Sequence, residues 1–134
     1  MAQNKNSLLL KITLIIFAVV ALVYGLIYVF VPQVLVEASG SEPVPSGWLR
    51  WSGAILVALG IGAIMVLRNP SKQGIFVTTL AIGALFCGLA LLYSVLFEMT
   101  GIGNIEQTLV PAIINLILSV LFWISLKKSK AILW

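Results

Sequence analysis

Charged residues are scarce in this chain of 134 residues: only 9% are Asp, Glu, Lys or Arg, whereas 61% are hydrophobic. The mean hydropathy is +1.16. A soluble domain carries about 25% charged residues. A surface that faces water cannot be built from so few charges, so most of the chain must face lipid or other protein. The sequence therefore excludes a soluble globular domain and predicts an all-α integral membrane protein.

Histidine is absent, and Cys87 is the single cysteine. The lack of histidine removes the commonest axial ligand of haem, a common ligand of zinc and copper, and the usual general base at neutral pH. A lone cysteine can form no disulfide or redox pair within the chain. The sequence also has no metal-ligand cluster and no nucleophile paired with a base. It therefore predicts no cofactor, no metal site and no enzymatic activity.

Long apolar runs, by contrast, are abundant. A helix needs roughly 20 residues to cross a hydrocarbon core of about 30 Å, and four runs are long enough. They lie at about residues 12–31, 48–67, 74–97 and 107–126. Pro32 and the pair Asn69-Pro70 end two of these runs, and Pro111 falls in the first turn of the fourth, where its missing N–H costs little. Because the connections are short, we expect one transmembrane domain, an antiparallel four-helix bundle.

The distribution of charge predicts the orientation of the bundle. All basic residues except Arg50 fall on one side: Lys5, Lys11, Arg68, Lys72, Lys127, Lys128 and Lys130. The four acidic residues fall on the opposite side: Glu37, Glu42, Glu98 and Glu106. Lys and Arg accumulate in cytoplasmic loops, so both termini should be cytoplasmic. This topology accounts for the net charge of +4, and no nucleic-acid partner is expected.

Arg50 opens the second span between Trp48 and Trp51, and the helical period places small residues on both of its flanks. The first flank has Gly53 and Gly60, and the second has Ala54, Ala58 and Gly62. Small residues at four-residue spacing let helix backbones approach closely. The pattern predicts that these residues pack against other helices, that the second span is the most enclosed of the four, and that Arg50 points toward protein.

Two further spans carry polar residues in their outer halves. Glu98 shares a face of the third span with Ser94 and with Ala84, a small residue suited to helix packing, and Asn115 lies in the fourth span. In one interpretation Arg50 is a boundary residue that extends to the outer head groups or pairs with Glu98. In the other, Arg50, Glu98, Asn115 and Ser94 line an outward-open cavity for a small polar or anionic ligand. The first is favoured, since charge costs little at the end of a span.

Two short motifs and one glycine carry a resemblance to a known group. "FVP" (Phe30–Pro32) ends the first span, "RWSG" (Arg50–Gly53) opens the second after a short outer segment, and Gly60 follows. In this layout most of the chain resembles the DoxX-like proteins and related uncharacterised four-helix proteins of bacterial inner membranes. Some of those proteins are accessory subunits linked to quinone-dependent redox enzymes. The resemblance therefore implies an accessory role in the inner (plasma) membrane, with Arg50 as the matching position.

Together these features predict a non-catalytic accessory or scaffold subunit that packs against a larger membrane protein complex. The alternative is a small transporter or a membrane protein that binds a small molecule, lipid or quinone in an outward-facing polar cavity around Arg50. The expected partners are the lipid bilayer and either another membrane protein or further copies of this chain.

Overall fold

The computed structural model of the protein describes residues 2–40, 45–98 and 105–134. Within these ranges 90% of the residues are helical and no strand occurs. The apolar composition accounts for this, because a segment in hydrocarbon must satisfy its own backbone N–H and C=O groups, and a helix does so within one segment. The prediction of an all-helical protein is confirmed.

Four long helices make up most of the molecule: α1 (Ala2–Phe30), α3 (Gly47–Arg68), α4 (Gly74–Tyr93) and α5 (Ile105–Lys128). Three short elements are α2 (Pro32–Ala38), the π-helical turn η1 (Ser94–Glu98) and α6 (Lys130–Leu133). Four segments are long and apolar enough to cross a membrane: Leu8–Phe30, Gly47–Arg68, Gly74–Glu98 and Ile105–Lys128. Each coincides with one predicted span, with ends shifted by a few residues. The chain is therefore a candidate multi-pass membrane protein.

Two prolines act differently from their sequence-based expectation. Pro32 does more than end α1: as the first residue of α2 it starts a second short helix, where its fixed φ suits the first turn. Pro111 lies inside α5 rather than in its first turn, because the helix begins already at Ile105. A proline at that position has no N–H to offer the carbonyl oxygen of Gln107, one turn earlier.

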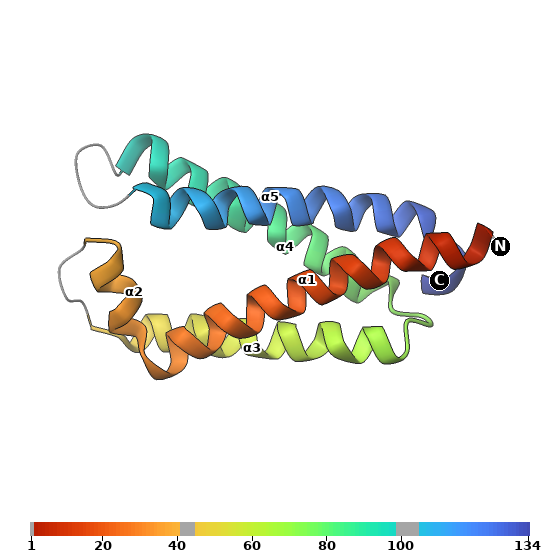
Figure 1. Ribbon diagram of the computed structural model, residues 1–134, viewed down its shortest axis with the longest axis horizontal. Coiled ribbons are helices and arrows are strands. Elements are labelled where there is room, and N and C mark those ends of the chain that lie inside the picture. The colour runs from red at the N-terminus through yellow and green to blue at the C-terminus, as the bar shows by residue number, and fades with distance from the viewer. Residues whose placement is uncertain (1, 41–44, 99–104) are drawn as a thin grey trace.

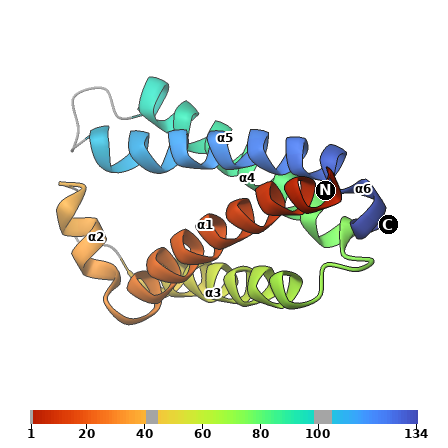
Figure 2. The same cartoon turned by 45° about the vertical axis from the view of Figure 1, so that its right-hand side comes forward.

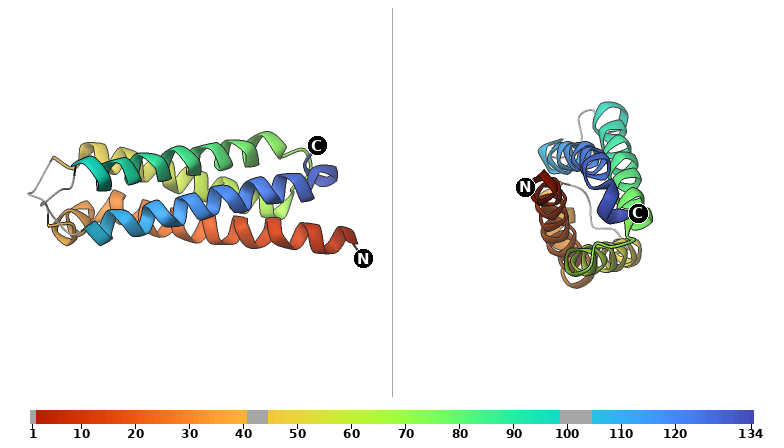
Figure 3. Two further views of the ribbon diagram at one scale, coloured as in Figure 1. Left: turned by 90° about the horizontal axis from the view of Figure 1, so that it is seen from above. Right: turned by 90° about the vertical axis from the view of Figure 1, so that its right-hand side faces the viewer.

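The long helices form two pairs. α1 packs along α3 and α4 along α5, whereas α1 and α5 share fewer contacts. Figure 1 shows both chain termini and the 69–73 turn at one end, which we call the terminal end, and α2 at the other, the α2 end. The pairs are close together at the terminal end and diverge toward the α2 end (Figures 1 and 2). In the end-on view of Figure 3, α4 begins beside α3 and rises away from it.

Two hydroxyl groups of α5 form hydrogen bonds toward the terminal end, one to α4 within the same pair and one to α1 of the other pair. Ser119 donates a hydrogen bond of 2.9 Å to the carbonyl oxygen of Ala81 on α4. Ser125 Oγ lies 3.4 Å from Thr13 Oγ on α1. Thr13 already donates to the carbonyl oxygen of Leu9, so Ser125 is the donor in this pair. All three hydroxyl side chains are buried, and hydrogen bonds of this kind hold helices together where no hydrophobic force acts between them.

Apolar packing strengthens the same end of the molecule. The rings of Phe17 on α1 and Phe122 on α5 meet edge to face with centroids 5.6 Å apart, a favourable geometry for aromatic pairs. Leu10, Leu14 and Leu80 are buried in the same core. At the C-terminus, the ring of Trp134 packs against Gly74, the first residue of α4, where no side chain stands in its way.

Inside the α1–α3 pair, two glycines face each other. A Cβ on Gly53 would lie 2.7 Å from the carbonyl oxygen of Gly25 and 2.7 Å from Cβ of Tyr28. A Cβ on Gly25 would in turn lie 3.0 Å from the carbonyl oxygen of Gly53. Gly60 allows a similar approach by the side chain of Leu22, since a Cβ there would lie 2.9 Å from Leu22 Cγ. Glycine thus sets the separation of α1 and α3.

Of the other small residues that were predicted to pack against neighbouring helices, some do so and some are exposed. Ala84 is buried on α4, and Gly62 lies against the ring of Phe76. Ala54 and Ala58 are exposed, so the second flank of α3 is largely uncovered by this chain. The prediction that this span is the most enclosed is wrong: 28% of its apolar window is buried, against 33% for the spans of α1 and α5. Helix α3 packs mainly on one partner, α1.

We expect Gly53→Ala to lower the free energy of unfolding by about 1–3 kcal/mol, because the added methyl group overlaps backbone atoms of α1 that cannot move alone. Gly83→Ala is the matched control, since a Cβ at Gly83 meets nothing within 4 Å. The control should leave stability unchanged or raise it slightly through helix propensity. Reversible unfolding in mixed micelles measures both variants, and equal losses for the two would contradict the glycine contact.

Candidate functional site

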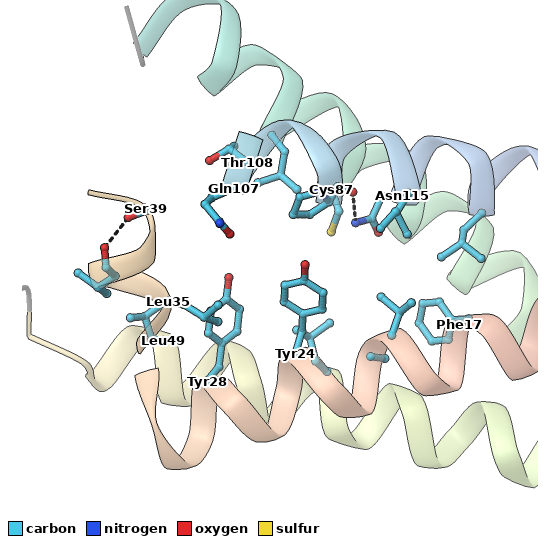
Figure 4. Close-up of a pocket in the computed structure, with 18 of the residues that line it drawn as sticks. Phe17, Tyr24, Tyr28, Leu35, Ser39, Leu49, Cys87, Gln107, Thr108 and Asn115 are labelled. Carbon is cyan, nitrogen blue, oxygen red and sulfur yellow. Dashed lines mark hydrogen bonds between the residues drawn. The ribbon is translucent and has the colours of Figure 1, made fainter. Parts of the chain in front are cut away.

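A cavity of about 450 Å³ lies between the two helix pairs, toward the α2 end. Residues from α1, α2, α3, α4 and α5 all contribute to its wall, and Figure 4 shows most of them converging on one space. Ligand pockets in proteins commonly have volumes of about 300–1,000 Å³. The divergence of the helix pairs therefore leaves room for a small molecule.

The short helix α2 forms part of the wall at the wide end. Pro32 and Val36 are buried, and Val36, Leu35 and Ser39 line the cavity. Ser39 donates a hydrogen bond of 2.7 Å to the carbonyl oxygen of Val36, which closes the last turn of the helix. Because Pro32 both ends α1 and begins α2, the chain turns there and lays α2 across the space between the pairs (Figure 1).

The part of the cavity nearest the terminal end is apolar. Phe17 and Ala21 on α1 and Leu118 on α5 line it, and all three are buried. These residues adjoin the core in which Phe17 meets Phe122. The hydrophobic core of the terminal end thus continues into the cavity without a polar boundary.

Polar side chains gather nearer the α2 end. Tyr24 and Tyr28 project from α1 with their hydroxyl groups directed across the cavity, and Gln107, Thr108 and Asn115 line it from α5 (Figure 4). The two tyrosine rings are 6.5 Å apart in an edge-to-face arrangement. They are one helical turn apart, so they share a face of α1.

Several of these polar groups have hydrogen-bonding capacity to spare. Asn115 donates one hydrogen bond of 2.9 Å to the carbonyl oxygen of Pro111, which leaves its amide oxygen and second N–H proton available. Within the described ranges neither the Tyr24 nor the Tyr28 hydroxyl is hydrogen-bonded to another residue. These hydroxyls face the cavity, where a ligand or water would supply their hydrogen-bond partners.

No charged side chain among the described residues lines the cavity. The wall instead combines apolar side chains with neutral hydroxyl, amide and thiol groups. Cys87, the only cysteine of the chain, is part of this wall and is exposed. The arrangement can hold a neutral molecule by shape and by hydrogen bonds, and it offers an ionised group no partner.

The structure does not bring the four residues of the predicted polar cluster together. Asn115 lines the cavity, whereas Ser94 and Glu98 lie on η1, where the Ser94 hydroxyl donates to the Glu98 carboxylate. Arg50 is exposed at the start of α3, and within the described ranges it forms no ion pair. Figure 1 places the end of α4 and the start of α3 on opposite sides of the molecule.

The predicted inward direction of Arg50 is therefore wrong, and so is the placement of an outer cavity around it. The residue lies in the first turn of α3 with an exposed side chain, and α3 packs mainly on α1 rather than on α4. This exposure fits the interpretation of Arg50 as a boundary residue beside Trp48 and Trp51, which are exposed as well.

Tyr24 and Tyr28 line the cavity, although the predicted polar cluster did not include them. The available signal was their spacing: they are the only polar side chains in the second half of α1, and they recur at four residues on the face that carries Phe17 and Ala21. An interfacial position is the ordinary explanation for tyrosine in a span. Hydropathy alone does not distinguish an interfacial tyrosine from one that lines a cavity.

Comparison of the chain with protein-family models, with curated proteins and with solved structures finds no match. The resemblance to DoxX-like proteins thus stays a prediction, and what the site can do is argued from its own residues.

We expect Arg50→Gln and Glu98→Gln each to change the free energy of unfolding by less than about 0.5 kcal/mol, as exposed substitutions usually do. The double variant should equal the sum of the two within about 0.5 kcal/mol, because residues that do not touch are additive. Unfolding of all four proteins in the same micelles measures this cycle. A coupling energy above about 1 kcal/mol would show that the two charges pair after all.

Proposed function

We propose that this protein binds a small lipid-like molecule within the membrane, in the cavity between its two helix pairs. One observation carries the proposal: a cavity of about 450 Å³ whose apolar wall includes several converging polar groups with spare hydrogen-bonding capacity. Such a combination is typical of small-molecule sites, where apolar contacts supply affinity and a few polar groups fix the orientation of the ligand. The protein acts as a binding protein and not as an enzyme.

The proposal includes a topology, an antiparallel bundle with both termini in the cytoplasm. Its support is the location of the basic residues that flank the spans at the terminal end: Lys11, Arg68, Lys72, Lys127, Lys128 and Lys130. The described acidic residues Glu37, Glu98 and Glu106 lie toward the α2 end; Glu42 and the side chain of Lys5 lie outside the described part of the chain. The positive-inside rule then places the cavity in the outer half of the bilayer.

Single cysteines introduced into a Cys87→Ala background test this topology in intact cells. We expect Ser46→Cys, before α3, to react with a membrane-impermeant maleimide added outside. Ser71→Cys, in the 69–73 turn, should react only after the cells are opened, because that turn is at the terminal end. The opposite pattern would invert the topology.

Native mass spectrometry of protein extracted in mild detergent tests the binding. We expect the wild-type chain to retain a small molecule and Cys87→Trp to lose it, because an indole at that position fills part of the cavity. Phe86→Trp is the matched control: its side chain is exposed next to Cys87 but does not line the cavity, so it should retain the molecule. Absence of any retained molecule from all three proteins would contradict the proposal.

An accessory subunit is the second candidate function. The observation that favours it is the exposed pair Ala54 and Ala58 on α3, whose four-residue spacing would let a helix of another chain approach closely. The same spectra test this candidate, since a subunit would appear with a second protein in fixed stoichiometry. If the chain is recovered without a second protein, the accessory-subunit candidate is contradicted and the binding function remains.

A further inference from the structure

We infer that the cavity selects an uncharged amphipathic molecule, a neutral lipid with a hydrogen-bonding head group and a single apolar tail. Its head lies beside Tyr28 and its tail extends toward Phe17. The inference rests on the proposed function and adds the chemical class and the orientation of the ligand. Three properties of the wall lead to it: its lack of charge, the position of its polar groups and the extent of its apolar part.

The lack of charge excludes most membrane lipids as ligands. Within the described residues the wall has no Lys, Arg, Asp or Glu that could neutralise a phosphate, carboxylate or ammonium group. The charged residues that adjoin wall residues in the sequence, Glu37, Arg50 and Glu106, are exposed and lie outside the wall. An ionised group buried without a partner is strongly disfavoured, whereas a neutral hydroxyl or carbonyl head needs only hydrogen bonds.

The polar groups of the wall match such a head. The hydroxyls of Tyr24, Tyr28 and Thr108 can each donate and accept, and the amide of Gln107 offers both kinds of group. They come from two opposing helices, α1 and α5, so a head group between them could be bound from both sides (Figure 4). Hydroxyl, ester or ketone oxygens satisfy this set equally well.

The apolar part of the wall matches a tail. From Tyr28 back to Phe17 is eleven residues of α1, or roughly 16 Å at about 1.5 Å per residue. Along this length the lining changes from hydroxyl groups to Ala21, Leu118 and Phe17, all buried. The volume of about 450 Å³ falls in the lower half of the usual range for ligand pockets. It therefore suits one narrow tail.

Cys87 provides the measurement, because it is the only cysteine and lines the cavity. The full chain is placed in phosphatidylcholine nanodiscs, and the rate of Cys87 labelling by an uncharged maleimide is followed. Three probes with the same saturated tail are compared: a monoacylglycerol, the fatty-acid anion and the alkyltrimethylammonium cation. We expect the monoacylglycerol to protect Cys87 at a concentration at least about tenfold below either charged probe. Ile114→Cys in a Cys87→Ala background is a second reporter on α5, because Ile114 lines the cavity without contributing a polar group.

Tyrosine variants test the position of the head. Tyr24→Phe and Tyr28→Phe each remove one hydroxyl and should raise the half-protecting concentration of the monoacylglycerol about fivefold. Tyr93→Phe is the matched control, because Tyr93 is exposed and outside the wall; it should have no effect. Equal effects of all three substitutions would overturn the assigned head position.

The failure of this inference can be told apart from the failure of the proposed function. Equal protection by the charged and neutral probes would overturn the chemical class and leave binding in the cavity established. If no probe protects either cysteine while native mass spectrometry finds a retained molecule that Cys87→Trp removes, the inference fails and the proposed function stands. If the retained molecule is absent as well, both fail.

Discussion

The contact between α1 and α5 at the terminal end, made by the hydroxyls of Thr13 and Ser125 and by the rings of Phe17 and Phe122, is the constraint on which the rest of the structure depends. This contact joins the two helix pairs, whereas the hydrogen bond from Ser119 holds α5 to α4 within one pair. In the described ranges no hydrogen bond joins the two helix pairs nearer the α2 end. Helix pairs held together at one end only are free to diverge at the other, so the position of the α1–α5 contact explains why there is a cavity and at which end it lies.

The glycine contact inside the α1–α3 pair then decides what faces that cavity. Gly25 lies against Gly53 at backbone distance, and this fixes the rotation of α1 about its own axis as well as its separation from α3. With Gly25 turned toward α3, Tyr24 and Tyr28 are turned toward α5 (Figure 4). Rotation of α1 by even one residue, about 100°, would direct other side chains into the space. A packing contact thus sets the chemistry of the site.

The number of spans and the role of Gly53 and Gly60 could be predicted from the sequence, because span length and small-residue spacing are properties of one helix. Which flank of α3 would be covered could not. The spans are apolar on all sides, so hydropathy marks no buried face, and Ala54 and Ala58 have the same spacing as residues that do pack. The predicted cluster around Arg50 failed for a related reason: similar depth along separate helices does not place residues on facing sides. Only Asn115 of that cluster lines the cavity.

The two ends of the molecule use similar side chains in opposite ways. At the terminal end the hydroxyls of Thr13, Ser119 and Ser125 are buried and paired within the chain. Near the α2 end the hydroxyls of Tyr24 and Tyr28 meet no partner in the described chain. Inside a bilayer an unsatisfied polar group is costly, so the first set stabilises the fold, whereas the second can be satisfied only from outside the chain. A protein that needed these tyrosines solely for packing would gain stability from phenylalanine at both positions. Their hydroxyl groups are therefore the observation that most supports the proposal of a bound molecule in the cavity.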